Sequence, residues 1–232
     1  YTDFYSGIAN SCNVYFYTVG GGYKDQKGLG PDRIKKYLSL FNWGQITGID
    51  LPGEKPGLTP DPEWKEKIIG ESWYIGNTYH LSIGQGYLRA TPLQVATAFS
   101  AIANGGKIFQ PQLLQKIIDT STDSVKILEE VQPKIIRENF IAPENLKIVR
   151  EGMREAVIYG SSVMLNNLPV KVAAKTGTAE TNREGYYHNW ITVFAPYEDP
   201  EIVLTIVIEN VPHLQAAALP TAKNILEWYF RR

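Results

Sequence analysis

Two short motifs contain the residues of this sequence that are best suited to chemistry. Ser11-Cys12-Asn13 places a hydroxyl and a carboxamide two positions apart, and Lys175-Thr176-Gly177-Thr178 places a cation beside two hydroxyls. The second motif suits an anion site. Its lysine supplies positive charge, its two threonines alternate onto one face of a strand, and its glycine lets a ligand approach the backbone.

Each motif also has a purely structural interpretation. A Ser-x-Asn triplet is expected about once by chance in a chain of this length, and its side chains can simply satisfy backbone groups. A specified Lys-Thr-Gly is expected in only about one such chain in twenty, but the same residues also suit an edge strand. Two residues that are two apart in a helix point ~200° away from each other, so a site at Ser11 requires a helix end or a break.

The single cysteine gives a third candidate. Cys12 with His80 or His188 could form a nucleophilic thiol–imidazole pair. Cys12 shares an apolar stripe with Ile8 and Tyr15, which favours a buried and inert thiol. The histidines lack metal-ligand spacing, so we predict no metal.

The elements that must position these motifs follow from apolar spacing. Residues 4–19 predict one helix with a buried face, and Val170–Ala174 predict a strand that leads into Lys175. The continuous apolar run Ile202–Ile208 predicts a strand buried on both faces, joined to the preceding strand by the turn Glu198-Asp199-Pro200. Further helices are expected at 31–41, 92–103, 143–157 and 220–229, further strands at 112–118, 125–128 and 189–194, and a long loop at 48–64.

Composition excludes several classes of protein. The 232 residues are 44% hydrophobic with a net charge of −1, which excludes a disordered chain and argues against a large nucleic-acid face. No run approaches 18 apolar residues, so we predict no bilayer span within the chain.

Five stretches in order resemble the penicillin-binding protein transpeptidase domains, closest to class B enzymes of the elongation type. The two motifs resemble the second and third motifs of the penicillin-recognising serine enzymes. Ile83-Gly84-Gln85-Gly86, followed by residues 90–96, is similar to a characteristic segment of these transpeptidases. Residues 49–54 and 103–106 are also similar to the family.

The resemblance implies an α+β fold of the β-lactamase/transpeptidase type, in which an antiparallel sheet is flanked by helices beside a mostly helical subdomain. We expect one domain over residues 1–232, with 1–160 mostly helical and 161–232 forming the sheet and the C-terminal helix. No serine here has a lysine three residues later, so the first family motif, Ser-x-x-Lys, is absent. We therefore expect an N-terminally incomplete domain without its nucleophile, which is inactive alone.

The resemblance also assigns roles. Ser11 would relay a proton toward the leaving nitrogen, Asn13 would hold the substrate amide, and Lys175 would place charge beside the serine pair and the substrate carboxylate. Thr176 and Thr178 would bind that carboxylate, the Thr178 N–H would supply half of an oxyanion hole, and Gly177 would keep the strand face open. No cofactor is implied.

The implied reaction cross-links peptidoglycan stem peptides that end in D-Ala-D-Ala, and β-lactam antibiotics would trap the serine. Implied partners are cell-wall elongation proteins, including a glycosyltransferase, on the periplasmic side of the bacterial inner membrane, with a membrane anchor outside this sequence. Two alternatives stay open. One is a penicillin-binding sensor or scaffold without turnover, and the other is a serine β-lactamase or D,D-carboxypeptidase.

Overall fold

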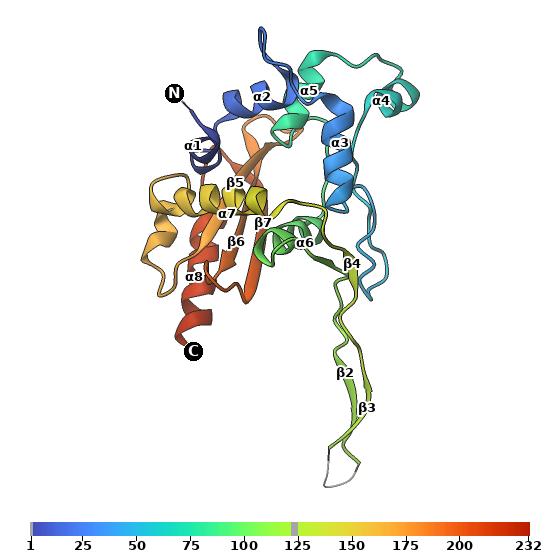
Figure 1. The fold of residues 1–232 in the computed structure, drawn as a ribbon, viewed down its shortest axis with the longest axis vertical. Helices are drawn as coiled ribbons and strands as arrows, with labels where there is room; N and C mark the ends of the chain where they lie inside the picture. The colour runs from blue at the N-terminus through green and yellow to red at the C-terminus, as the bar shows by residue number, and fades with distance from the viewer. Residues whose placement is uncertain (1, 122–124) are drawn as a thin grey trace.

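A three-stranded antiparallel sheet forms the centre of the molecule in the computed structural model, which describes residues 2–121 and 125–232. Its strands are β5 (Ala173–Glu180), β6 (Tyr186–Ala195) and β7 (Ile202–Pro212), in the order β5-β6-β7 (Figure 1). Lys175 pairs with Thr192 across β5 and β6. The lysine motif therefore lies on a strand at one edge of the sheet.

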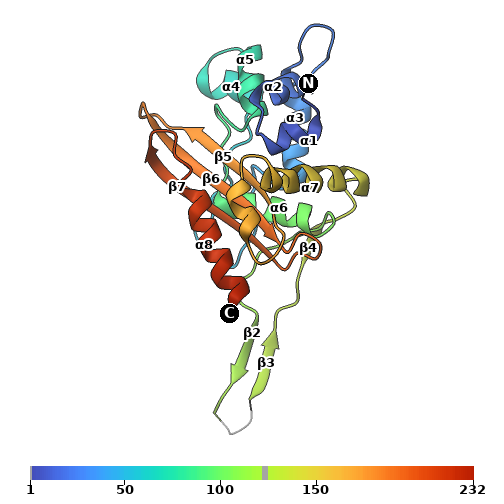
Figure 2. The ribbon, with the colours of Figure 1, turned by 90° about the vertical axis from the view of Figure 1, so that its left-hand side faces the viewer.

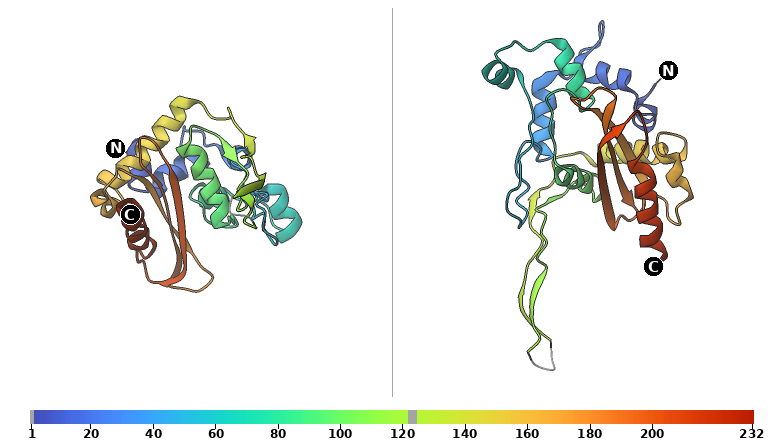
Figure 3. Two further views of the ribbon diagram at one scale, coloured as in Figure 1. Left: turned by 90° about the horizontal axis from the view of Figure 1, so that it is seen from below. Right: turned by 180° about the vertical axis from the view of Figure 1, so that it is seen from behind.

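Helices cover both faces of this sheet. Helix α8 (Ala218–Arg231) packs on one face and α6 (Pro92–Ala103) on the other, as the view from below shows (Figure 3). Side chains of β6 alternate between the two sides, so Ile191 and Val193 join the core under α8, whereas Phe194 joins a second core. Helix α7 (Pro143–Ile158) runs beside β5 and contributes to both cores (Figure 2). The 3₁₀ helix Val163–Asn167 follows it.

The N-terminal part is helical. Its helices are α1 (Phe4–Ala9), α2 (Asn13–Gly21), α3 (Gly30–Leu40), α4 (Pro62–Ile69) and α5 (Ile75–Ser82). The expectation of one helix over residues 4–19 is wrong, because the chain breaks between α1 and α2 at Ser11, whose φ is 52°. The expected start of α6 is confirmed, since Thr91 is its N-cap, Pro92 is its first residue, and Thr91 and Gln94 form a capping box.

A long hairpin projects from the body (Figure 1). Strands β2 (Lys116–Asp119) and β3 (Lys126–Glu130) pair antiparallel, and at its foot β1 (Ile108–Phe109) pairs with β4 (Ile135–Arg137). The expected strands near 112–118 and 125–128 are thus present. No helix in the described ranges is long and apolar enough to span a bilayer.

The predicted class, an α+β fold with an antiparallel sheet flanked by helices, is confirmed. The predicted β6–β7 hairpin is also confirmed by the pairing of Ala195 with Ile202. The prediction that Ile202–Ile208 is buried on both faces is wrong, because these residues are only half-buried. Strand β7 pairs only with β6 among the residues that the structure covers, and its other edge is open.

Candidate active site

Ser11 lies in the break between α1 and α2. Its backbone N–H donates to the Ile8 carbonyl at 3.1 Å, which closes the last turn of α1, and its positive φ turns the chain into α2. A non-glycine residue in this left-handed region costs of order 1 kcal/mol, and such residues concentrate at functional sites. The break aims the Ser11 hydroxyl at the sheet rather than along a helix face.

Lys175 meets that hydroxyl. Its Nζ donates to Ser11 Oγ at 2.7 Å and to the Thr176 carbonyl oxygen at 2.7 Å. Burial lowers the pKa of Lys175 from 10.5 to about 8, because desolvation disfavours the charged form. In the described part of the chain no carboxylate forms an ion pair with Lys175. The result is a lysine that lines the cleft, is mostly protonated at neutral pH and has no carboxylate partner among the described residues.

The outer edge of β5 offers backbone groups beside this cation. The Thr178 carbonyl accepts from Gln85 Nε2 at 3.2 Å, and the Glu180 N–H donates to Gln85 Oε1 at 3.3 Å, so both groups face outward. In an antiparallel ladder the N–H and C=O of one residue point to the same side. The Thr178 N–H therefore also faces the outer edge, where a donor could meet a developing oxyanion.

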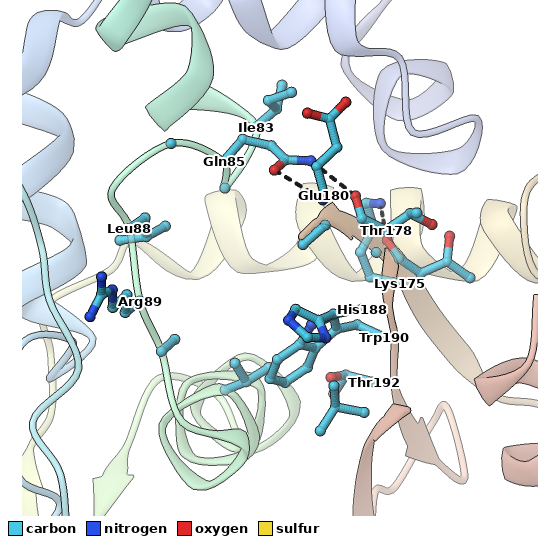
Figure 4. A pocket seen from close by; sticks show the side chains of 18 of the residues that line it. Ile83, Gln85, Leu88, Arg89, Lys175, Thr178, Glu180, His188, Trp190 and Thr192 are labelled. Carbon is cyan, nitrogen blue, oxygen red and sulfur yellow. Dashed lines mark hydrogen bonds between the residues drawn. The ribbon is translucent and has the colours of Figure 1, made fainter. Parts of the chain in front are cut away.

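A cleft of about 460 Å³ lies between the sheet and the segment that joins α5 to α6. Lys175, Thr176, Gly177 and Thr178 line the cleft on the side of the sheet. The Gln85 side chain comes from the joining segment and reaches Thr178 and Glu180 of β5 (Figure 4). A Cβ at Gly177 would meet Trp190 Cβ at 3.3 Å, so a side chain there would crowd the cleft wall. Further lining residues include His188, Thr192, Phe99 and Arg89.

The predicted site residues are only partly gathered at this cleft. Ser11 reaches it through Lys175 without lining it. Asn13 begins α2, is exposed, and does not line the cleft. Cys12 is only partly buried, contrary to the expectation of a buried thiol, while His188 lines the cleft and His80 is exposed.

Two contact residues were missed by the sequence reasoning. Ser161 Oγ accepts a hydrogen bond from Thr176 Oγ1 at 3.0 Å, and the Ser161 N–H donates to the Ala9 carbonyl at 2.9 Å. Ser161 thereby ties β5 to the end of α1, just before Ser11. No motif marked it. Gln85 carried a signal, since it lies in the Gly-Gln-Gly segment, but the resemblance gave it no role.

Other residues of the resembling segments hold the scaffold. Glu54 accepts hydrogen bonds from the backbone N–H groups of Thr47 and Gly48, and Asp50 accepts from those of Leu113 and Leu114. For Glu54 burial raises the pKa, but these hydrogen bonds together outweigh it and leave the pKa below its ordinary value. For Asp50 the hydrogen bonds lower the pKa against a smaller opposing effect of burial. Across the described residues, no three His, Cys, Asp or Glu side chains lie close enough to hold a metal.

Comparison with known proteins gives one consistent family. The family model for the penicillin binding protein transpeptidase domain matches residues 1–227. The peptidoglycan D,D-transpeptidase MrdA of Haemophilus influenzae is 29% identical over 250 residues, which cover 100% of this chain and 37% of the relative. The chain thus spans well under half of that protein.

Solved structures agree with this match. Penicillin-binding protein PBP2 of Helicobacter pylori, in a complex with MreC, has a TM-score of 0.77 at 30% identity, covering 99% of this chain and 41% of the other. PBP2 of Pseudomonas aeruginosa, in complex with WCK 5153, has a TM-score of 0.77 at 31% identity, covering 97% and 48%.

Proposed function

Because the chain belongs to the family of penicillin-binding protein transpeptidase domains, we propose that it forms the substrate-facing part of a peptidoglycan D,D-transpeptidase. The contact between Lys175 Nζ and Ser11 Oγ at 2.7 Å, at the end of the cleft, carries this proposal. The contact brings together two groups: a hydroxyl, which can relay a proton, and a cation, which can hold a carboxylate.

The reaction proposed is acyl transfer through a serine ester. A serine hydroxyl attacks the carbonyl between two D-alanines, the ester forms, and the terminal D-alanine leaves with the serine's proton, relayed through Ser11. An amine from a second stem then attacks the ester, forms the cross-linking amide, and returns a proton to the serine. Lys175 holds the terminal carboxylate, and the Thr178 hydroxyl adds a donor. Thr176 adds a second donor when its proton turns from Ser161 Oγ to the carboxylate and the Ser161 hydroxyl donates to Thr176 Oγ1 instead. The Thr178 N–H faces the oxyanion.

The attacking serine lies outside these 232 residues in this proposal. The chain contains no Ser-x-x-Lys, and the open edge of β7 would accept a further strand of the sheet. We therefore propose that the full-length protein supplies both, and that the 232-residue chain alone is inactive. The likeness to the PBP2 complex with MreC supports elongation proteins as partners, and with them a place on the outer side of the inner membrane.

Labelling with a fluorescent penicillin tests the proposal. The full-length protein should label covalently, and Ser11→Ala should slow labelling by about 10²–10⁴-fold, the usual contribution of a proton relay. Ser39→Ala is the matched control, because the Ser39 hydroxyl only bonds a carbonyl within α3. The 232-residue chain should not label.

Two results would contradict this function. Rapid labelling of Ser11→Ala would remove its proposed role, and labelling of the isolated chain would show that the nucleophile lies within it. Product analysis then separates the alternatives, since a carboxypeptidase or β-lactamase releases hydrolysed product, whereas a transpeptidase yields cross-linked stems. A sensor or scaffold would bind without turnover.

A further inference from the structure

The Gln85 side chain is hydrogen-bonded to the outer edge of β5. Its carboxamide donates to the Thr178 carbonyl and accepts from the Glu180 N–H, although Gln85 precedes these two residues by 93 and 95 positions in the sequence. These two backbone groups flank one residue, which is the spacing that a residue of a parallel strand would bridge. The carboxamide thus supplies the donor and the acceptor that one residue of an added parallel strand would supply (Figure 4).

An extended peptide that adds to this edge needs the same space. Peptides bind open sheet edges through main-chain hydrogen bonds, and an antiparallel peptide would use both the N–H and the C=O of Thr178. The Thr178 carbonyl is already bonded to Gln85 Nε2. The acceptor that a substrate amide requires is therefore the one that Gln85 covers.

The backbone that carries Gln85 is fixed, so only its side chain can leave easily. The Gln85 N–H donates to the His80 carbonyl at 2.9 Å, and the Gly84 N–H donates to the Leu81 carbonyl at 3.1 Å. Gly84 and Gly86 hold positive φ angles of 75° and 74°, which shape this tight end of α5. A rotation of the glutamine side chain is enough to uncover Thr178.

We propose that Gln85 is an internal competitor, whose carboxamide occupies the peptide-binding edge of β5 and rotates away when an extended acyl-peptide or a β-lactam side-chain amide pairs with Thr178. This inference rests on the proposed function for the identity of the ligand. Both hydrogen bonds are solvent-exposed, so their loss should favour the ligand about threefold to tenfold.

Two variants of the full-length protein test the competitor. Gln85→Ala removes both bonds, whereas Gln85→Glu keeps an acceptor for the Glu180 N–H but loses the donor to Thr178. Both should be acylated by a fluorescent penicillin about threefold to tenfold faster than the wild type. Amide hydrogen exchange over residues 178–184 should be faster in Gln85→Ala and close to the wild type in Gln85→Glu. Gln112→Ala, which removes a glutamine bonded to Val131 at the foot of the hairpin, should change neither measurement.

Three outcomes separate the possibilities. Unchanged exchange in Gln85→Ala would show that the contact does not form in solution, and would overturn the proposal. Faster exchange with slower acylation would mean that Gln85 holds the substrate rather than competes with it, and would also overturn it. A wild-type protein that is never acylated would refute the proposed function, while the exchange result would still report on the contact.

Discussion

The charge on Lys175 predicts a pH profile that can be measured. Its pKa of about 8 means that about nine-tenths of the molecules carry the cation at pH 7 and about one-tenth at pH 9. If the cation holds the carboxylate of the ligand, the second-order rate constant for acylation by a fluorescent penicillin should fall about tenfold between these pH values. Lys175→Arg should abolish this fall, because a guanidinium stays charged above pH 12.

The assay compares slopes rather than absolute rates, because arginine is larger than lysine and differs in shape. Acylation of the full-length protein is followed from pH 6.5 to 9.5 for the wild type, Lys175→Arg and Lys175→Met. The methionine variant should be slow at every pH and show no fall near pH 8. A flat wild-type profile, or an equal fall in the arginine variant, would refute the role of the Lys175 charge.

Three further variants test the scaffold. Since the folded pKa of Lys175 is below its unfolded value of 10.5, the charged lysine destabilises the fold below pH 8, and this penalty disappears as pH rises to 10.5. Lys175→Met should therefore raise the free energy of unfolding at pH 7 by at most about 3 kcal/mol. Urea titrations at several pH values measure this increase, and an increase that does not shrink toward pH 10.5 would contradict the reasoning. Ser161→Ala should raise KM for a D-Ala-D-Ala peptide about threefold to tenfold with little change in kcat, because the Thr176 hydroxyl loses its partner. Ser161→Thr should restore the wild-type KM. A fall in kcat alone would argue against a positioning role for Ser161. Gly160→Ala should destabilise the protein by about 1–3 kcal/mol, because its Cβ would lie 2.2 Å from the last carbonyl of α1. At Gly76, within α5, a Cβ meets nothing, so Gly76→Ala should not destabilise the protein in the same unfolding experiment.

Local chemistry made much of the fold predictable. Thr91 and Pro92 specified the start of α6, and apolar spacing predicted the helices that form α7 and α8. The break at Ser11 was not predictable in the same way. The apolar spacing continues from Ile8 past Cys12, while the turn depends on backbone geometry that no glycine or proline announces.

Long-range contacts limited the prediction of the site. The two motifs supplied Ser11 and Lys175, but their meeting depends on how α1 packs against the sheet. Ser161 and Gln85 are ordinary polar residues in sequence, and their importance comes only from partners in β5. The run Ile202–Ile208 showed that a strand is apolar, but not whether a neighbouring strand covers its edge.

The separation of Ser11 and Lys175 has a consequence for how the protein matures. Their contact closes a loop of 164 residues. At a synthesis rate of about 5–20 residues per second, roughly 8–33 seconds pass after translation of the serine before its lysine is made. During that interval almost none of β5–β7 has been made, so the pocket can form only after it. Covalent labelling by penicillin should therefore be absent from ribosome-bound chains that stop before Lys175.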